Sequence, residues 1–273
     1  MITFNHSGGI GDILYSLHFC KDLSFKGNQE KFNFHIQTNI EDNNMKMHSH
    51  PFGNVRMTEG AANFVKPLLE AQAYINEVTI SDECNIDSGM INLDTFRRIK
   101  INFMSGDIRR WYYNLSKQHL PAELWRPVIS VDKDDTYKDK IVLVCTSRYQ
   151  NIFIDYKKLV DFADKFVFFG IESEYENFKK QYFDVEFYKV EDALDAAKKI
   201  YGAKGFCGNQ CGLYAIAECL KVPRILTGAE IVSFNGNIAP GPHNVHPLGG
   251  WCEDVATSEK LVASLNEMLI KED

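Results

Sequence analysis

One carboxylate near the start of the chain, Asp12, stands where it could act as a base. It closes the glycine-rich stretch Ser7–Asp12, which contains Gly8, Gly9 and Gly11. Glycine tolerates positive φ and lets a ligand approach the backbone closely. Asp12 itself has two interpretations that the stretch leaves open: a helix cap, or a general base at the mouth of a cleft.

The residues on either side supply the elements that would position this turn. A β-type run, Ile2–Phe4, precedes it, and apolar residues at helical spacing follow over residues 13–21. A strand, a glycine turn and a helix direct backbone N–H groups toward an anion. The glycine spacing differs from the dinucleotide fingerprint, so a bound dinucleotide is only weakly supported.

A second strand–turn–helix unit lies in the C-terminal part of the chain. Its turn opens a helical pattern over residues 213–220 and could cradle a diphosphate at the helix N-terminus. Tight turns without a ligand are common too. The candidate binding residues are Gly208, Asn209, Gln210, Cys211 and Gly212.

Two charged residues of this second half could serve the same site. Arg148 lies in the loop after the strand predicted at 141–145, and a guanidinium there can form paired hydrogen bonds with phosphate. A plain surface arginine is the alternative. Glu218 lies two turns into the helix, where it could reach a ribose or be an exposed helix carboxylate.

Strand and helix patterns alternate along the whole chain. Strands are predicted at 2–4, 32–37, 75–80, 90–93, 141–145, 166–169, 185–190, 204–207 and 222–226. Helices are predicted at 13–21, 61–71, 111–120, 156–166, 172–182, 191–200, 212–220 and 258–270, and residues 236–243 have the composition of a loop.

This alternation predicts an α/β protein with parallel, doubly wound sheets. The charged run Asp132–Asp135 is the candidate linker, which gives Rossmann-like domains at 1–135 and 136–273. Ligands of open α/β sheets bind beyond the carboxyl ends of the strands, so we expect the two turns to face one cleft.

Composition narrows the function classes. A chain of 273 residues with 45% hydrophobic residues can build two ordinary α/β domains. A net charge of −7 without a basic cluster argues against nucleic acid as a partner. No apolar run of about eighteen residues predicts a membrane span, and the N-terminus lacks a signal core. Seven cysteines, mostly in apolar runs, indicate reduced thiols in a cytoplasmic protein, and their spacing does not favour a metal site.

Together the motifs resemble glycosyltransferase family 9, the heptosyltransferase-like group. Its N-terminal motif has the form G-D-(I/V), which Gly11–Ile13 matches. Its late motif, D-S-G-x-x-H-x-A-x-A-x-x-x-P, is matched in relaxed form by Asn209–Gly212, Ala215, Ala217 and Pro223. Asn209 and Tyr214 stand nearest the aspartate and histidine of that motif.

The resemblance implies a GT-B fold, in which two Rossmann-like domains face a cleft. It implies a nucleotide-diphosphate sugar donor on the C-terminal domain, an acceptor hydroxyl on the N-terminal domain, Asp12 as the base, and neither metal nor cofactor. The leading hypothesis is a metal-independent glycosyltransferase. The alternative is a non-catalytic nucleotide or nucleotide-sugar binding protein of the same fold, and a sugar-nucleotide epimerase is a third possibility.

Overall fold

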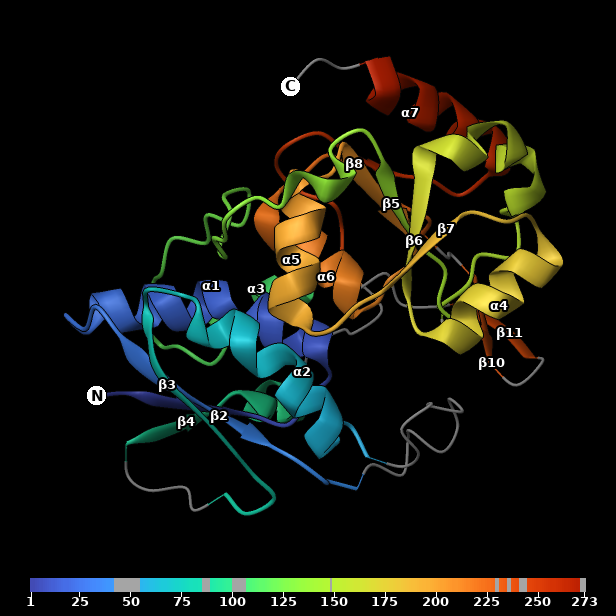
Figure 1. Cartoon of the computed structure of the whole chain (residues 1–273). Coiled ribbons are helices and arrows are strands. Elements are labelled where there is room, and N and C mark those ends of the chain that lie inside the picture. Colours follow the sequence, from blue (N-terminus) through green and yellow to red (C-terminus); the bar gives the residue numbers. More distant parts are fainter. Residues whose placement is uncertain are drawn as a thin grey trace.

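The computed structural model contains two separate parallel sheets, one in each half of the chain (Figure 1). It describes residues 1–41, 55–84, 89–99, 107–147, 149–228, 231–234, 237–240 and 245–270. The α/β class and the two-sheet arrangement expected from the sequence are confirmed.

The N-terminal sheet has four parallel strands in the order β3-β2-β1-β4. These are β1 (Thr3–His6), β2 (Phe32–Gln37), β3 (Ile75–Ser81) and β4 (Met90–Asn92). The associated helices are α1 (Ile10–Lys26), α2 (Glu59–Glu70), α3 (Ile108–Tyr113) and the 3₁₀ helix η2 (Leu93–Arg98). Because β1 and β4 are parallel neighbours, with Asn5 opposite Asn92, the segments that follow them leave the sheet at one edge.

The C-terminal sheet has six parallel strands in the order β12-β9-β8-β5-β6-β7. These are β5 (Ile141–Val144), β6 (Phe166–Gly170), β7 (Glu186–Lys189), β8 (Gly205–Gly208), β9 (Arg224–Leu226) and β12 (Cys252–Asp254). Its helices are α4 (Glu172–Gln181), α5 (Ala193–Gly202), α6 (Gly212–Leu220), α7 (Ser258–Ile270), and the 3₁₀ helices η3 (Asp135–Tyr137) and η4 (Tyr156–Lys165). Strand β5 reads Ile-Val-Leu-Val and is fully buried, as an interior strand of a sheet covered on both faces should be.

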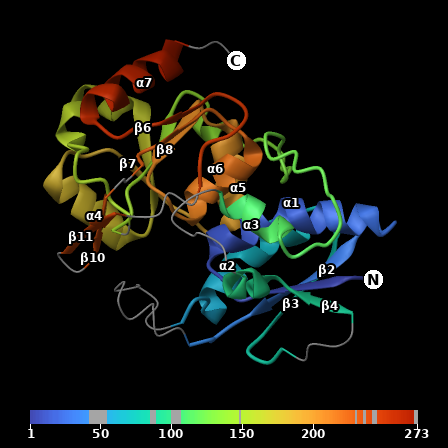
Figure 2. The same cartoon turned by 180° about the vertical axis from the view of Figure 1, so that it is seen from behind.

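Helices from the two sheets form a shared middle layer (Figure 1 and Figure 2). Helix α1 packs against α6, and α2 packs against α5. Small residues allow this approach, since a Cβ added to Gly11 would lie 3.8 Å from Cβ of Ala215. One hydrophobic core runs through the layer from β1 to β8, and a second lies on the other face of the C-terminal sheet. The two halves are therefore joined through packed helices.

Two predicted helices differ from the observed ones. The helix predicted at 111–120 is α3, which begins earlier because Asp107 caps it by accepting a hydrogen bond from the N–H of Arg109. It ends at Tyr113, well before the predicted end. The helix predicted at 156–166 is the 3₁₀ helix η4.

Three strands were not predicted from the sequence. Part of the loop predicted at 236–243 is strand β11 (Asn237–Pro240), which pairs antiparallel with β10 (Ile231–Phe234). The third is β12, an edge strand too short to show alternation. Among the described residues, no helix combines the length and the apolar character needed to cross a membrane.

Candidate functional site

Asp12 lies on the first turn of α1, beyond the carboxyl end of β1. The N-cap of this helix is Gly9, and no side chain caps it. The Asp12 carboxylate binds Arg97 instead, with Oδ2 2.6 Å from Nη2. The helix-cap interpretation is therefore wrong, although a carboxylate on a first turn still favours the helix dipole. The side chain is 27% exposed, so a second molecule can reach it.

Arg97 of η2 is fixed by two carboxylates. Its Nε lies 3.3 Å from Oδ1 of Asp94, and its guanidinium lies over the ring of Phe96, 4.7 Å from the ring centroid. Burial alone would lower the pKa of Arg97, but the carboxylates of Asp12 and Asp94 outweigh it and raise the pKa above its usual value. Asp94 also accepts the N–H of Ser7 at 2.7 Å. Arg97 is thus a permanent cation that holds the Asp12 carboxylate in place.

His6, the last residue of β1, ties the turn to α3. The N–H of Gly8 donates to Nδ1 at 2.8 Å, so Nε2 carries the ring proton and donates to the hydroxyl of Tyr112 at 2.7 Å. Tyr112 in turn donates to the backbone oxygen of Asp12 at 3.0 Å. Burial lowers the pKa of His6, so the ring is neutral at pH 7 and its 3.4 Å approach to Asp94 is not an ion pair.

The glycines of the first turn matter for the space that a missing side chain leaves, and not for a positive backbone φ. None of Gly8, Gly9 and Gly11 has a positive φ, which corrects the expectation from the sequence. A Cβ on Gly8 would lie 2.5 Å from Cε1 of His6 and 2.6 Å from Oδ2 of Asp12. A Cβ on Gly9 would meet nothing within 4 Å. Gly8 therefore lets the turn close tightly, while Gly9 borders open space at the N-terminus of α1.

In the second turn, which joins β8 to α6, two predicted ligand residues have structural partners. Cys211 is the N-cap of α6, and its Sγ accepts the N–H of Tyr214 at 3.4 Å. The amide of Asn209 binds the backbone of Thr146 in both directions, with Oδ1 accepting at 3.0 Å and Nδ2 donating at 3.0 Å. Asn209 thereby joins the loops that follow β8 and β5.

The two glycines of this turn are explained by packing. A Cβ on Gly208 would lie 2.7 Å from the backbone oxygen of Val144, and one on Gly212 would lie 3.2 Å from Cγ2 of Ile10. Neither glycine has a positive φ. Gln210 is half-buried between them. The turn is therefore a compact junction, and its backbone at the start of α6 is the part best suited to an anion.

The first turns of α1 and α6 lie side by side. Ile10 contacts Gly212 at the start of both helices, and further along Sγ of Cys219 lies 3.7 Å from the backbone oxygen of Leu14. Contacts therefore advance in step along both helices, which means that α1 and α6 run parallel. Their N-termini point the same way, and the positive ends of two helix dipoles favour an anion at this shared edge.

Two charged residues of the second half, Arg148 and Glu218, were also candidates for the site. Arg148 lies outside the described residues. Glu218 is fully buried, so both interpretations offered for it are wrong. Its carboxylate binds Arg109 of α3, Lys221 at 2.6 Å and Nε of Arg224 at 2.5 Å.

Sequence reasoning did not single out the partners of Asp12. His6 ends β1, and Asp94 and Arg97 follow β4. A usable signal existed, because polar residues that directly follow two neighbouring parallel strands meet at one edge of the sheet. Using it required knowing that β4 lies beside β1, which local patterns do not reveal.

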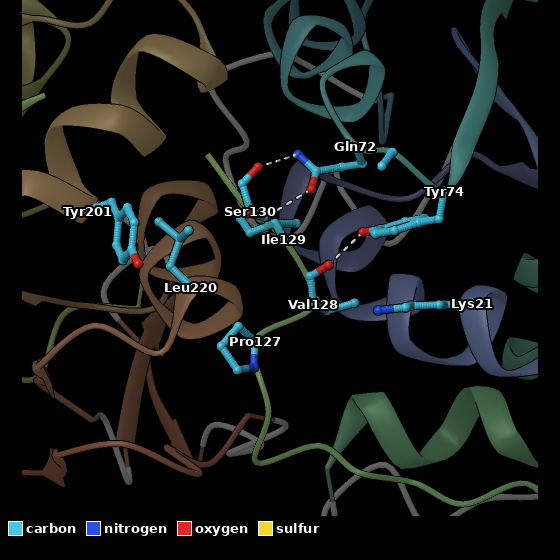
Figure 3. Close-up of a pocket in the computed structure, with 10 residues that line it drawn as sticks. Lys21, Gln72, Tyr74, Pro127, Val128, Ile129, Ser130, Tyr201 and Leu220 are labelled. Atoms are coloured by element: carbon cyan, nitrogen blue, oxygen red, sulfur yellow. Dashed lines mark hydrogen bonds between the residues drawn. The ribbon is translucent and has the colours of Figure 1, made fainter. Parts of the chain in front are cut away.

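A cavity of about 310 Å³ lies elsewhere, toward the C-terminal ends of α1 and α6 (Figure 3). It contains none of the predicted site residues. Polar groups in its walls form hydrogen bonds with one another: Gln72 binds the backbone of Ser130, and the Tyr74 hydroxyl donates to the backbone oxygen of Val128 at 2.8 Å.

Comparison with known proteins finds solved structures of similar fold. No family model matches the sequence, and no curated protein matches it. Among solved structures, a family 9 glycosyltransferase from Veillonella parvula DSM 2008 is similar, with TM-score 0.59, 11% identity, and coverage of 99% of this chain and 97% of that one.

Two Escherichia coli structures are similar to the same degree. Heptosyltransferase WaaC with ADP-2-deoxy-2-fluoro heptose has TM-score 0.58 and 12% identity, covering 97% of this chain and 99% of its own. ADP-heptose lipopolysaccharide heptosyltransferase II has TM-score 0.57 and 12% identity, covering 98% of both chains. The chain therefore has the GT-B fold of the family 9 glycosyltransferases over nearly its whole length.

Proposed function

We propose that this protein is a glycosyltransferase that moves a sugar from a nucleotide-diphosphate donor to an acceptor hydroxyl without a metal ion. The observation that carries the proposal is the convergence of two helix N-termini beside an accessible carboxylate. Asp12 lies on one of these first turns, and Ile10 of the same turn contacts Gly212 of the other. Such a transfer needs a base for the acceptor hydroxyl and a site that stabilises the anionic leaving group.

In the proposed reaction, Asp12 accepts the proton of the acceptor hydroxyl as its oxygen attacks the anomeric carbon. The bond from that carbon to the diphosphate oxygen breaks, and the nucleoside diphosphate leaves with its negative charge. Backbone N–H groups at the starts of α1 and α6 stabilise this charge, and Arg148 is proposed to assist them. Arg97 keeps the carboxylate oriented.

We place the acceptor on domain 1–135 and the donor on domain 136–273. Residues 128–135 form the connecting segment between the halves. Their contacts fit a boundary near residue 135, because Ser130 binds Gln72 of the first half whereas Asp134 binds Lys199 of the second, 2.9 Å away. The similar WaaC structure holds ADP-2-deoxy-2-fluoro heptose, which suggests a nucleoside diphosphate as the first probe.

The test is a transfer assay over a panel of nucleotide-diphosphate sugars and glycan acceptors, preceded by thermal-shift screening with the nucleoside diphosphates. Asp12→Ala should abolish transfer while nucleotide binding survives, since the base is removed and the helix N-termini are kept. Full transfer by this variant would remove Asp12 from the mechanism.

One observation favours the non-catalytic alternative. Asn209 and Tyr214, which stand nearest the aspartate and histidine of the family motif, are both buried. Asn209 is occupied by Thr146, and neither side chain lies at the surface of the described structure. Calorimetry that finds tight nucleotide binding without transfer or hydrolysis would support a binding protein. Conversion of a nucleotide sugar without any acceptor would indicate an epimerase.

A further inference from the structure

A buried cluster of charged residues spans the two halves of the molecule. Arg109 and Asp107 come from the N-terminal half, and Glu218, Lys221 and Arg224 from the C-terminal half. We propose that Arg109 and Glu218 are positioning residues that hold the two halves at one fixed separation, so that the candidate site works without domain closure.

The geometry of the cluster leaves its central carboxylate no freedom. Glu218 binds Arg109 across the halves, and it also binds Lys221 at 2.6 Å and Arg224 at 2.5 Å. Both Arg109 and Glu218 are almost completely inaccessible to solvent, with side-chain exposures of 1% and 0%. Separating the halves would break the Arg109–Glu218 pair and expose the apolar layer around it to water, although Arg109 would keep Asp107 and Glu218 would keep Lys221 and Arg224.

Arg109 is itself fixed from several sides. Asp107 binds it through both carboxylate oxygens, and the backbone oxygen of His246 accepts from its Nη2 at 2.6 Å. Asp107 also accepts the backbone N–H of His246 at 3.2 Å. The C-terminal half therefore approaches Arg109 through both Glu218 and the segment after residue 244, and no single contact carries the interface.

The connecting segment is attached to both halves, which removes the usual place for a hinge (Figure 3). Val128 donates its N–H to the backbone oxygen of Cys219 at 3.0 Å and accepts from the hydroxyl of Tyr74 at 2.8 Å. Two residues on, the N–H of Ser130 donates to Gln72 at 2.9 Å. The apolar layer of α1, α2, α5 and α6 continues the same attachment.

The cluster lies on the elements that carry the candidate site. Glu218 belongs to α6, whose first turn begins at Gly212, and Arg109 lies on the first turn of α3, whose Tyr112 binds the backbone of Asp12. A fixed cluster therefore fixes the distance between Asp12 and the second turn. The fixed geometry does not depend on the reaction; only its consequence for substrate binding rests on the proposed function.

The first experiment measures the distance between the halves in the wild-type chain by pulsed electron paramagnetic resonance. Spin labels are attached through a non-canonical amino acid at Glu70 in α2 and Glu176 in α4, which are both exposed. We expect one narrow distribution that does not shift when ADP, UDP, GDP or CDP is added. Two distances, or a shift on adding any of these nucleotides, would overturn the proposal without any variant.

The second experiment repeats the measurement on Glu218→Gln and on Arg109→Lys. Glu218→Gln should broaden the distribution or add a second distance, and Arg109→Lys, which keeps the charge but loses the fork of hydrogen bonds, should give a smaller change. The matched control is Asp195→Asn, because the 2.7 Å pair between Asp195 and Lys199 lies wholly within one half. The control should lower stability without changing the distance.

The outcomes separate the two proposals. Distributions that stay as narrow as wild type in both cluster variants would reduce the cluster to a local packing feature. If Glu218→Gln does not fold, Arg109→Lys and the wild-type measurement still test whether the cluster fixes the separation of the halves. A narrow, cluster-dependent distribution in a chain that shows no transfer with any donor would leave this inference standing and end only the transferase proposal.

Discussion

At the scale of single residues, the candidate site depends on groups whose protonation and position are set by their neighbours. Arg97 is held as a cation between Asp12 and Asp94, while burial keeps His6 neutral. Asp12 therefore faces the open side of the turn with a fixed backbone and a fixed carboxylate. The glycines beside it differ sharply in what they tolerate.

Gly8→Ala and Gly9→Ala form a matched pair. The new methyl group on residue 8 would overlap Asp12 and His6, so we expect unfolding free energy to fall by about 1–3 kcal/mol. The methyl group on residue 9 meets open space, so stability should change by less than about 0.5 kcal/mol. Urea titration measures both. Equal losses in the two variants would show that the packing around Gly8 is not as described.

His18 gives the molecule a defined pH dependence. Burial lowers its pKa to about 3, and its Nε2 donates to the backbone oxygen of Arg126 at 3.1 Å. Above the unfolded value of 6.5 the ring is neutral in both states, and its contribution to stability is complete. As the pH falls below that value, the unfolded chain takes up a proton that the folded chain refuses. Unfolding free energy should then drop by up to about 1.4 kcal/mol per pH unit.

His18→Gln removes this term, so its stability should be flatter than wild type between about pH 6.5 and pH 5, a window above most carboxylate titrations. His6 contributes equally to the pH dependence of stability in wild type and in His18→Gln, so its contribution cancels in the comparison. His119→Gln, at an exposed position, is the control and should keep the wild-type slope. Parallel curves for wild type and His18→Gln would contradict the assignment.

At the scale of elements, the start of α6 is a capped helix as well as a candidate anion site. Cys211 accepts the N–H of Tyr214 as a cap, although serine is the better residue for this role. The cysteine is thus explained without a ligand. What the element offers a diphosphate is its backbone and its dipole.

Substitutions at Cys211 separate the cap from the binding site. Cys211→Ser should keep or slightly raise the unfolding free energy, while Cys211→Ala should lower it by about 0.5–2 kcal/mol. Nucleotide affinity should be the same in Cys211→Ser and wild type, as measured by calorimetry. A large affinity loss in Cys211→Ser would instead make the thiol a ligand contact.

The elements were largely predictable from the sequence, and the partners were not. The continuous run Ile141–Val144 and the glycine turns gave strands and helices at the right places, because burial and turn chemistry are local. The burial of Glu218 could not be predicted from local sequence, because it depends on Arg109, more than a hundred residues earlier in the chain. The same holds for Arg97, which meets Asp12 only because β4 pairs beside β1.

At the scale of the whole molecule, two sheets share one layer of helices. The core that includes residues of β1 also includes residues of β8, so neither half can lose its structure without exposing the other. This arrangement makes the chain behave as one unit, despite a length at which intermediates are common.

We therefore expect a single unfolding transition. Trp111 alone, after Trp125→Phe and Trp251→Phe, reports on the first half, and Trp251 alone reports on the second. Both fluorescence curves should coincide with far-ultraviolet circular dichroism in urea, because loss of either half exposes the shared apolar layer. Midpoints that differ between the two reporters would show that the halves unfold separately.

The close approach of Ile10 to Gly212 constrains how this chain can diverge. With 3.2 Å between Cγ2 of Ile10 and a Cβ at residue 212, an alanine there is tolerated only where residue 10 becomes smaller or moves aside. Homologous sequences should therefore exchange bulk between these two columns of an alignment, a large side chain in one accompanying a small one in the other. Two positions some two hundred residues apart would then carry a joint evolutionary record of how the glycine-rich turns came to meet.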